Sequence, residues 1–341
     1  MEFIRQTLAQ NFTGGNTTTT DGHFTHDDVP DQSGKVGVIT GGSEGIGYGV
    51  SYTLLAKNIS KLYILSVSKE VVDGATKAVE GDLGAEAAGK IKWLQCDMSD
   101  WKRVTEVAKE ISDSTDRLDI LVLNAARGIM TAQLDSHGVD RHMSVNHFGH
   151  AILTSHLLPL LKKTADAGHT VRISSQASNV HQSVPSDQQF KSLEDLNKDL
   201  GPNSQYGRAK LAPLLYARYL GRHLSKEHPK ILANATHPGI VKTKMSQEDI
   251  HEPFPLAGYG MSVAMAPFKK DQFEGALSTL YAATKTENTG EYITPPAKPE
   301  TGSELANSVE LQEDLMELTV RIIKEKTKPD SVDKGCPFKT Y

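Results

Sequence analysis

A tyrosine and a lysine four residues apart could form a proton-transferring pair. Tyr206 and Lys210 lie in the run YGRAK, at the start of a stretch that the sequence predicts to be helical. A spacing of four places both side chains on one helix face, about 5 to 6 Å apart at Cβ. A phenol must lose about 2 to 3 pKa units to act as a base at neutral pH, which costs about 3 to 4 kcal/mol. One cation at about 4 to 5 Å, in an effective dielectric of about 20, supplies a similar amount.

Two other polar sites lie in apolar surroundings upstream. Ser174 and Ser175 end the strand-like run TVRISS, and Asn146 lies in VNHFG within a long apolar helix. Ligands of open α/β sheets bind at the carboxyl ends of the strands, where a serine hydroxyl could hydrogen-bond a substrate oxygen. An asparagine in an apolar helix is costly unless its amide is satisfied, which indicates a structural or relay role.

A glycine-rich turn, TGGSEGIG, follows the first predicted strand and opens a helix. Gly41 permits a tight turn, Gly45 lets the backbone approach a pyrophosphate closely, and Gly47 lets the helix pack on the strand. Such turns also use glycine for steric reasons alone, so the motif needs support from the others. Its position predicts a dinucleotide site.

Strand-like and helical stretches alternate between residues 35 and 295, and the strands are nearly all apolar. This alternation predicts a single doubly wound α/β domain with a parallel sheet covered on both faces. Residues 1–34 are predicted to be an N-terminal extension. Its apolar stripe of Ile4, Leu8 and Phe12 could dock on the body or rest on a membrane surface. Residues 296–341 are predicted to hold a connector, a capping helix and a tail.

Composition excludes several other classes of protein. The formal net charge of -5 gives no basic field for nucleic acid, and no apolar run is long enough to span a bilayer. Cys96 and Cys336 lie far apart, which argues against a disulfide framework. The N-terminus has no apolar signal region, and the acidic Glu2 argues against a mitochondrial transit peptide. We therefore expect a cytoplasmic protein.

Seven ordered motifs over about residues 35–295 resemble the short-chain dehydrogenase/reductase family. TGGSEGIG resembles its cofactor turn, CDM its adenine-ring acid, LVLNAA its NNAG stretch and VNHFG its asparagine helix. RISS resembles its serine strand, YGRAK its Tyr-Lys motif and PGIVKT the turn that holds the nicotinamide amide. The turn and the insertion between serine and tyrosine are closest to retinol-dehydrogenase-like and fungal light-induced members. The resemblance implies a Rossmann-type fold and hydride transfer between a nicotinamide cofactor and a carbonyl or alcohol.

The resemblance also assigns roles to a catalytic tetrad of Asn146, Ser175, Tyr206 and Lys210. Tyr206 would be the general acid or base, and Ser175 would polarise the substrate oxygen. Lys210 would depress the pKa of the tyrosine and hold the ribose, and Asn146 would place a water in a proton relay. The second serine of the pair is preferred because it is the catalytic one in the family.

The end of the second strand bears on the choice of cofactor. An acid there usually selects NAD, whereas this chain has Ser68 and Lys69, and Lys69 could reach a 2′-phosphate. NADP(H) is therefore favoured, with NAD(H) as the alternative, and Glu44 counts against NADP because relatives often carry Arg there. The expected cofactor-binding residues are Gly41, Ser43, Gly45, Ile46, Gly47, Ser68, Lys69, Asp97, Met98, Asn124, Tyr206, Lys210, Val241 and Thr243.

Several alternatives stay open. A non-catalytic NAD(P)-binding regulator or scaffold would keep the fold but commonly loses the tyrosine or lysine, and an epimerase would carry a different turn and a larger C-terminal domain. No metal is expected, because the histidines near residues 137–156 are not paired with cysteines or closely spaced acids. The segments 176–205 and about 244–270 are expected to line the pocket, and the aromatic and methionine content of the run PFPLAGYGMSVAMAPF in the second suggests a lipophilic substrate, although both segments could simply pack on the C-terminal helix. The apolar helix HFGHAILTSHLLPLL, residues 147–161, could form a homodimer face.

Overall fold

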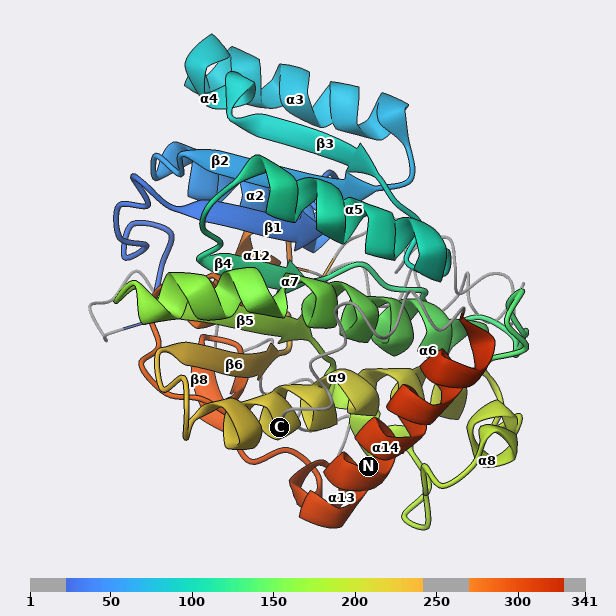
Figure 1. Cartoon of the computed structure of the whole chain (residues 1–341). Coiled ribbons are helices and arrows are strands. Elements are labelled where there is room, and N and C mark those ends of the chain that lie inside the picture. The colour runs from blue at the N-terminus through green and yellow to red at the C-terminus, as the bar shows by residue number, and fades with distance from the viewer. Residues whose placement is uncertain (1–22, 242–269, 328–341) are drawn as a thin grey trace.

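The computed structural model describes residues 23–241 and 270–327 (Figure 1). The predicted stripe of Ile4, Leu8 and Phe12, the cofactor residue Thr243 and nearly all of the segment 244–270 lie outside the described residues.

An eight-stranded sheet in the order β3-β2-β1-β4-β5-β6-β7-β8 forms the centre of the described part. All neighbouring strands are parallel except β7 and β8, so the predicted doubly wound parallel sheet is confirmed. Apolar residues fill the central strands because both faces are covered. The strands are β1 (Val36–Thr40), β2 (Lys61–Ser66), β3 (Ile91–Gln95), β4 (Ile120–Leu123), β5 (Val171–Gln176), β6 (Ile231–Thr236), β7 (Tyr292–Thr294) and β8 (Lys298–Glu300).

Helices pack against both faces of the sheet, and each face has its own apolar core (Figure 1). One face is covered by α5 (Trp101–Ser114), α7 (Gly149–Asp166) and α9 (Pro202–Leu224), with α14 (Val309–Lys326) lying on α9. The other face is covered by α2 (Gly45–Ala56), α3 (Lys69–Leu83) and α12 (Gln272–Thr284). The short helical elements are α4 (Ala85–Gly89), α6 (Arg141–Met143), η1 (Ser144–Phe148), η2 (Asn179–Ser183), α8 (Leu193–Asn197) and α13 (Glu304–Asn307).

Three features differ from the simplest interpretation of the sequence. Residues 23–34, expected to lie outside the core, include the buried Val29, and the His26 ring lies 3.0 Å from Thr53 Oγ1 on α2. The strand β8 adds an antiparallel edge beyond residue 295. The long apolar helix predicted to carry Asn146 contains a π-helical turn, η1, at that residue. The division into three parts stays a prediction.

Candidate active site

The glycine turn between β1 and α2 has the backbone that a dinucleotide site requires. Gly41 and Gly45 have φ angles of +65° and +54°, a region that favours glycine. A Cβ added at Gly47 would lie 2.1 Å from the Gly41 carbonyl oxygen, so no other residue fits without movement. The residues present therefore fit a pyrophosphate approaching the start of α2.

Asn124 fixes this turn from the neighbouring strand. Its Nδ2 donates to the carbonyl oxygens of Thr40 at 3.0 Å and Gly41 at 3.2 Å. Its own backbone N–H donates to Thr40 Oγ1 at 2.9 Å. Asn124, predicted as a cofactor-binding residue, is thus seen to hold the shape of the turn.

An alanine at Gly47 is expected to weaken cofactor binding by at least about tenfold and to destabilise the protein by about 1 to 3 kcal/mol, because its Cβ would force the turn apart. The matched control is Gly74→Ala in α3, where an added Cβ meets nothing within 4 Å. That change is expected to stabilise the protein by about 0.5 to 1 kcal/mol. Titration calorimetry and thermal unfolding measure both effects. Wild-type affinity and stability in Gly47→Ala would contradict the assignment.

Tyr206 and Lys210 lie in the first turns of α9, as their spacing predicts. The helix begins after Gly201, whose φ is +76°, and Pro202 occupies its first position, where a missing N–H costs nothing. Lys210 Nζ lies 5.8 Å from the centroid of the Tyr206 ring. Lys210 is buried, and burial lowers its pKa to about 8. The ammonium and the phenol can therefore influence one another in a partly desolvated site.

Ser175 lies at the carboxyl end of β5, beside Leu123 of β4 and Ala235 of β6. Side chains alternate between the faces of a strand. The Gln176 side chain accepts a hydrogen bond from Thr279 of α12, so Ser175 faces the opposite side, which α9 covers. Lys210 Nζ donates to the Gln176 carbonyl at 3.0 Å, which ties the lysine to this strand end. The Ser175 hydroxyl is buried and makes no hydrogen bond with the described residues.

Ser174 is the competing serine, and its hydroxyl is also buried without a hydrogen-bond partner among the described residues. It shares the face of Gln176, away from α9, because the side-chain period of a strand is two. The alternation therefore favours Ser175 for contact with a substrate next to Tyr206.

Asn146 lies in the π-helical turn η1, and such turns are frequent at functional sites. Its Oδ1 accepts from the Arg127 N–H at 2.7 Å, and its Nδ2 donates to the Arg127 carbonyl at 3.2 Å. Both halves of the amide thus hold the loop that follows β4. A structural role is clear, and the water relay stays a prediction.

The predicted adenosine-side residues lie at the carboxyl ends of β2 and β3. The Ser68 hydroxyl caps α3 by accepting from Val71 N–H, and Lys69 Nζ is 2.6 Å from Asp73 on the surface. Asp97 is exposed and accepts two hydrogen bonds from Ser99. Asp97 does not cap α5, because Asp100 does so. Its carboxylate is therefore placed where it could also accept from a ligand.

The remaining predicted cofactor residues follow β1, β3 and β6 along the chain. Met98 is buried between β3 and α7, and Val241 is buried against Gly275 of α12. In the turn, Ser43 is buried and Ile46 is half-buried. Thr243, predicted to bind the nicotinamide amide, lies outside the described residues.

His237 is a residue that the sequence analysis missed. Its side chain is buried at the end of β6, and neither ring nitrogen makes a hydrogen bond with the described residues. Burial, with smaller contributions from His181, Lys270 and Lys210, lowers its pKa to about 3. The only signal in the sequence is that His237 directly precedes the PGIVKT motif, in which only the residues after it were expected to bind the cofactor.

The clustered histidines make separate contacts rather than one site. His137 stacks on Trp101, His147 lies 2.8 Å from Thr319 Oγ1, and His150 lies 2.9 Å from Thr40 Oγ1. Within residues 23–241 and 270–327, no group of three or more His, Cys, Asp or Glu side chains could hold a metal ion. Over the same ranges, no helix is both long and apolar enough to cross a membrane.

Comparison with known proteins identifies the family. The pattern of the family described as short chain dehydrogenase matches residues 35–186. A Neurospora crassa protein named as oxidoreductase bli-4, mitochondrial, is 55% identical over 343 residues, which cover 99% of this chain and 83% of that protein. The chain belongs to the short-chain dehydrogenase family. The resemblance seen in the sequence is confirmed, and the protein is an oxidoreductase.

Other relatives of this short-chain dehydrogenase are more distant. The short chain dehydrogenase/reductase dpchH of Colletotrichum higginsianum is 31% identical, over 89% of this chain and 78% of its own. The polyprenol dehydrogenase of Danio rerio is 29% identical, over 77% of this chain and 78% of its own. A crystal structure of a Mycobacterium paratuberculosis protein has a TM-score of 0.67 at 24% identity, covering 89% of this chain and 98% of its own, which shows the shared fold. Members of the family bind a nicotinamide cofactor.

Proposed function

We propose that this short-chain dehydrogenase transfers a hydride between NADP(H) and a lipophilic carbonyl or alcohol, with Tyr206 as general acid or base. The observation that carries the proposal is the position of Lys210. Its buried ammonium donates to the carbonyl of Gln176, the residue after Ser175, and lies 5.8 Å from the Tyr206 ring. One cation therefore links the phenol to the strand end that carries the serine hydroxyl.

The bound nicotinamide cofactor would supply the hydride acceptor or donor. In the direction of reduction, Tyr206 gives its phenolic proton to the substrate oxygen, and in oxidation it takes the hydroxyl proton. Ser175 Oγ, which has no protein partner among the described residues, donates a hydrogen bond to that oxygen. Lys210 favours the phenolate by its charge, and Asn146 would place a water for proton exchange with solvent.

One comparison supports a lipophilic substrate. The distant relatives from Danio rerio and Homo sapiens are named polyprenol dehydrogenase. The test is a panel of long-chain and cyclic aldehydes, ketones and alcohols assayed with NADPH or NADP⁺. We expect turnover of lipophilic members in preference to short polar ones.

The alternative is a cofactor-binding regulator or scaffold without turnover. Such a protein would bind NADP(H) in calorimetry but leave the whole panel unchanged. The presence of Asn146, Ser175, Tyr206 and Lys210 together favours the enzyme. Cofactor binding without any turnover across the panel would favour the alternative instead.

Lys69 carries the proposed preference for NADP(H). Its ion pair with Asp73 is exposed on both sides, and such pairs are worth less than about 1 kcal/mol, so the lysine can exchange Asp73 for a 2′-phosphate. Lys69→Ala is expected to raise the Kd for NADPH by about tenfold or more while the Kd for NADH is unchanged. Lys77→Ala, on the exposed side of the same helix, is the control and should change neither Kd. Tighter binding of NADH than NADPH by the wild type would overturn the preference.

The compartment and the oligomeric state are predicted from the sequence. The cytoplasm stays our prediction, and the name of the Neurospora crassa relative makes mitochondria the specific alternative. Fractionation of cells that express a tagged full-length protein decides between the two. A homodimer stays a prediction, and because Leu157, Leu158 and Leu161 of α7 are buried within the chain, such a dimer would use other side chains.

A further inference from the structure

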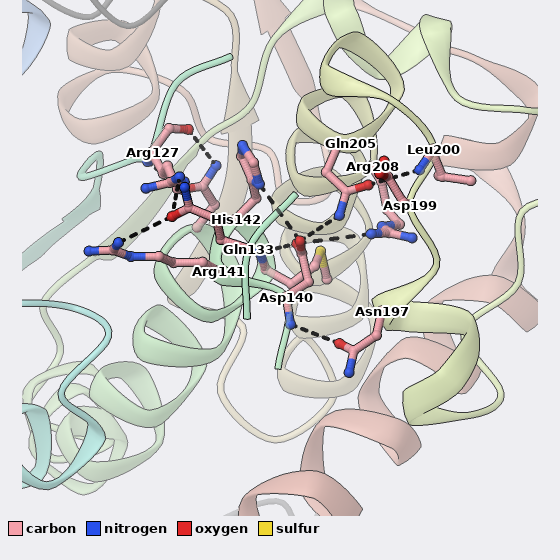
Figure 2. Close-up of polar contacts among 12 residues, drawn as sticks. Arg127, Gln133, Asp140, Arg141, His142, Asn197, Asp199, Leu200, Gln205 and Arg208 are labelled. Carbon is pink, nitrogen blue, oxygen red and sulfur yellow. Dashed lines mark hydrogen bonds and ion pairs between the residues drawn. The ribbon is translucent and has the colours of Figure 1, made fainter. Parts of the chain in front are cut away.

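A buried polar cluster lies beside the proposed tetrad without belonging to it. Asp140 caps α6 by accepting from the Met143 N–H at 2.9 Å, and Gln205 Nε2 donates to its other oxygen at 2.5 Å. Arg208 Nη2 lies 3.9 Å from the same carboxylate, and His142 Nδ1 lies 3.7 Å from it. Figure 2 shows Asp140 between these side chains, which come from two helical segments. Asp140, His142, Gln205 and Arg208 are all buried.

The same cluster holds the loop that precedes α9 (Figure 2). Asn197 accepts from the Asp140 N–H and donates to the Gly138 carbonyl, both at 2.8 Å. Arg208 Nη1 donates to the carbonyls of Asp195 and Lys198, at 3.2 and 3.1 Å. Three segments, 138–142, 195–200 and 205–208, are therefore joined through two charged side chains.

Charge explains why such a cluster can be tolerated in the interior. Burial raises the pKa of Asp140, but contacts with His142, Met143 and Gln205 outweigh this and hold the pKa below its ordinary value. Burial lowers the pKa of Arg208, which the Asp140 and Asp199 carboxylates oppose. Buried ion pairs are frequently no more stable than apolar replacements, but they select one geometry because a misplaced charge is costly.

The location of the cluster relative to the tetrad indicates which geometry is selected. Gln205 and Arg208 share one face of α9, since they are three residues apart, and Tyr206 and Lys210 share the adjacent face. On the other side, α6 runs directly from Asp140 into η1, which carries Asn146. A shift of α9 along this contact would move Tyr206 relative to both Asn146 and Ser175.

We propose that Asp140 and Arg208 are positioning residues for the reaction, whose buried contact sets the register of α9 and so the place of the Tyr206 hydroxyl. This inference rests on the proposed function of Tyr206. Neither side chain needs to touch substrate or cofactor. A misplacement of about 1 Å can cost about a hundredfold in rate, so small register changes would be visible in kcat.

The test compares the wild type, Asp140→Asn and the double variant Asp140→Leu/Arg208→Met, which replaces the pair by apolar side chains. We expect kcat to fall by about tenfold to a hundredfold with the Kd for NADPH little changed. We also expect the Tyr206 phenol to titrate about one pH unit higher than in the wild type, because a shift of α9 would break the bond between Lys210 Nζ and the Gln176 carbonyl that holds the ammonium near the phenol. Tyrosinate absorbance, with Tyr206→Phe as the blank, measures that titration without any substrate.

The matched control is Asp119→Asn. It removes the charge of another buried carboxylate, which pairs with Arg117 at the amino ends of β1 and β4. It should lower the melting temperature while leaving kcat and the Tyr206 titration unchanged. Wild-type kcat and titration in either folded Asp140 variant would overturn the inference. Should both fail to fold, Arg208→Lys is measured in the same way, and unchanged values there overturn it too. If the wild type turns over no substrate but the Asp140 variants still raise the Tyr206 titration as expected, the proposed function is refuted instead.

Discussion

Tyr206→Phe is expected to lower turnover by about 10² to 10⁴-fold while leaving the Kd for the cofactor nearly unchanged. The substitution removes only the phenolic hydroxyl, and a positioned general acid or base contributes about this much. Steady-state kinetics on a substrate from the lipophilic panel measures the rate, and calorimetry measures the Kd. Tyr219→Phe removes a phenol from the same helix and serves as the control, with the wild-type rate expected. Full activity in Tyr206→Phe would refute the mechanism.

Lys210→Met is expected to abolish most of the activity and yet stabilise the cofactor-free protein at neutral pH. The cation stabilises the phenolate by about 3 to 4 kcal/mol. Its loss should therefore lower the rate by about 10² to 10³-fold. Burial lowers the pKa of Lys210 from 10.5 to about 8, which corresponds to about 3 kcal/mol of destabilisation below pH 8. Methionine avoids that cost but leaves the Gln176 carbonyl without its donor, so the net gain should be about 1 to 2 kcal/mol.

The pH dependence of this gain identifies its cause. A lysine whose pKa is lower in the folded state binds fewer protons there than in the unfolded chain, so wild-type stability should rise between about pH 8 and 10.5. The advantage of Lys210→Met should therefore shrink over this window. Urea unfolding at several pH values measures it, with the exposed Lys77→Met as the control. A constant difference between Lys210→Met and wild type from pH 7 to 10.5 would show that burial of the charge is not the cause.

Much of the fold could be predicted because the central strands carry near-continuous apolar runs. Such runs, alternating with amphipathic stretches, fit a parallel sheet covered on both faces and little else. The glycine turn was equally informative, since Gly41 and Gly47 meet steric demands that sequence spacing reveals. Short elements such as α8 and β8 carry too few residues for a periodic pattern to show.

The candidate site was predictable only in part, because side-chain partners depend on contacts between distant segments. The interpretation of Asn124 as a cofactor residue could not include its two bonds to the turn, which come from a different strand. Asp140 carried no signal at all. Its partners Gln205 and Arg208 lie about 65 residues further along the chain, and no helical or strand period links them. The assignment of Asn146, Ser175, Tyr206 and Lys210 to catalysis stays a prediction until the variants are measured.

The packing of α14 on α9 has a consequence for biosynthesis. Synthesis runs from the N-terminus, so α9 leaves the ribosome well before the segment that covers it. Until then the face of α9 that α14 covers stays exposed to chaperones and proteases, and His147 lacks Thr319. A chain stopped after Ser308 is expected to accumulate in aggregated or degraded form, which pulse labelling and solubility assays would detect. Soluble, wild-type-like accumulation of that truncation would show that α9 does not depend on its late-made partner.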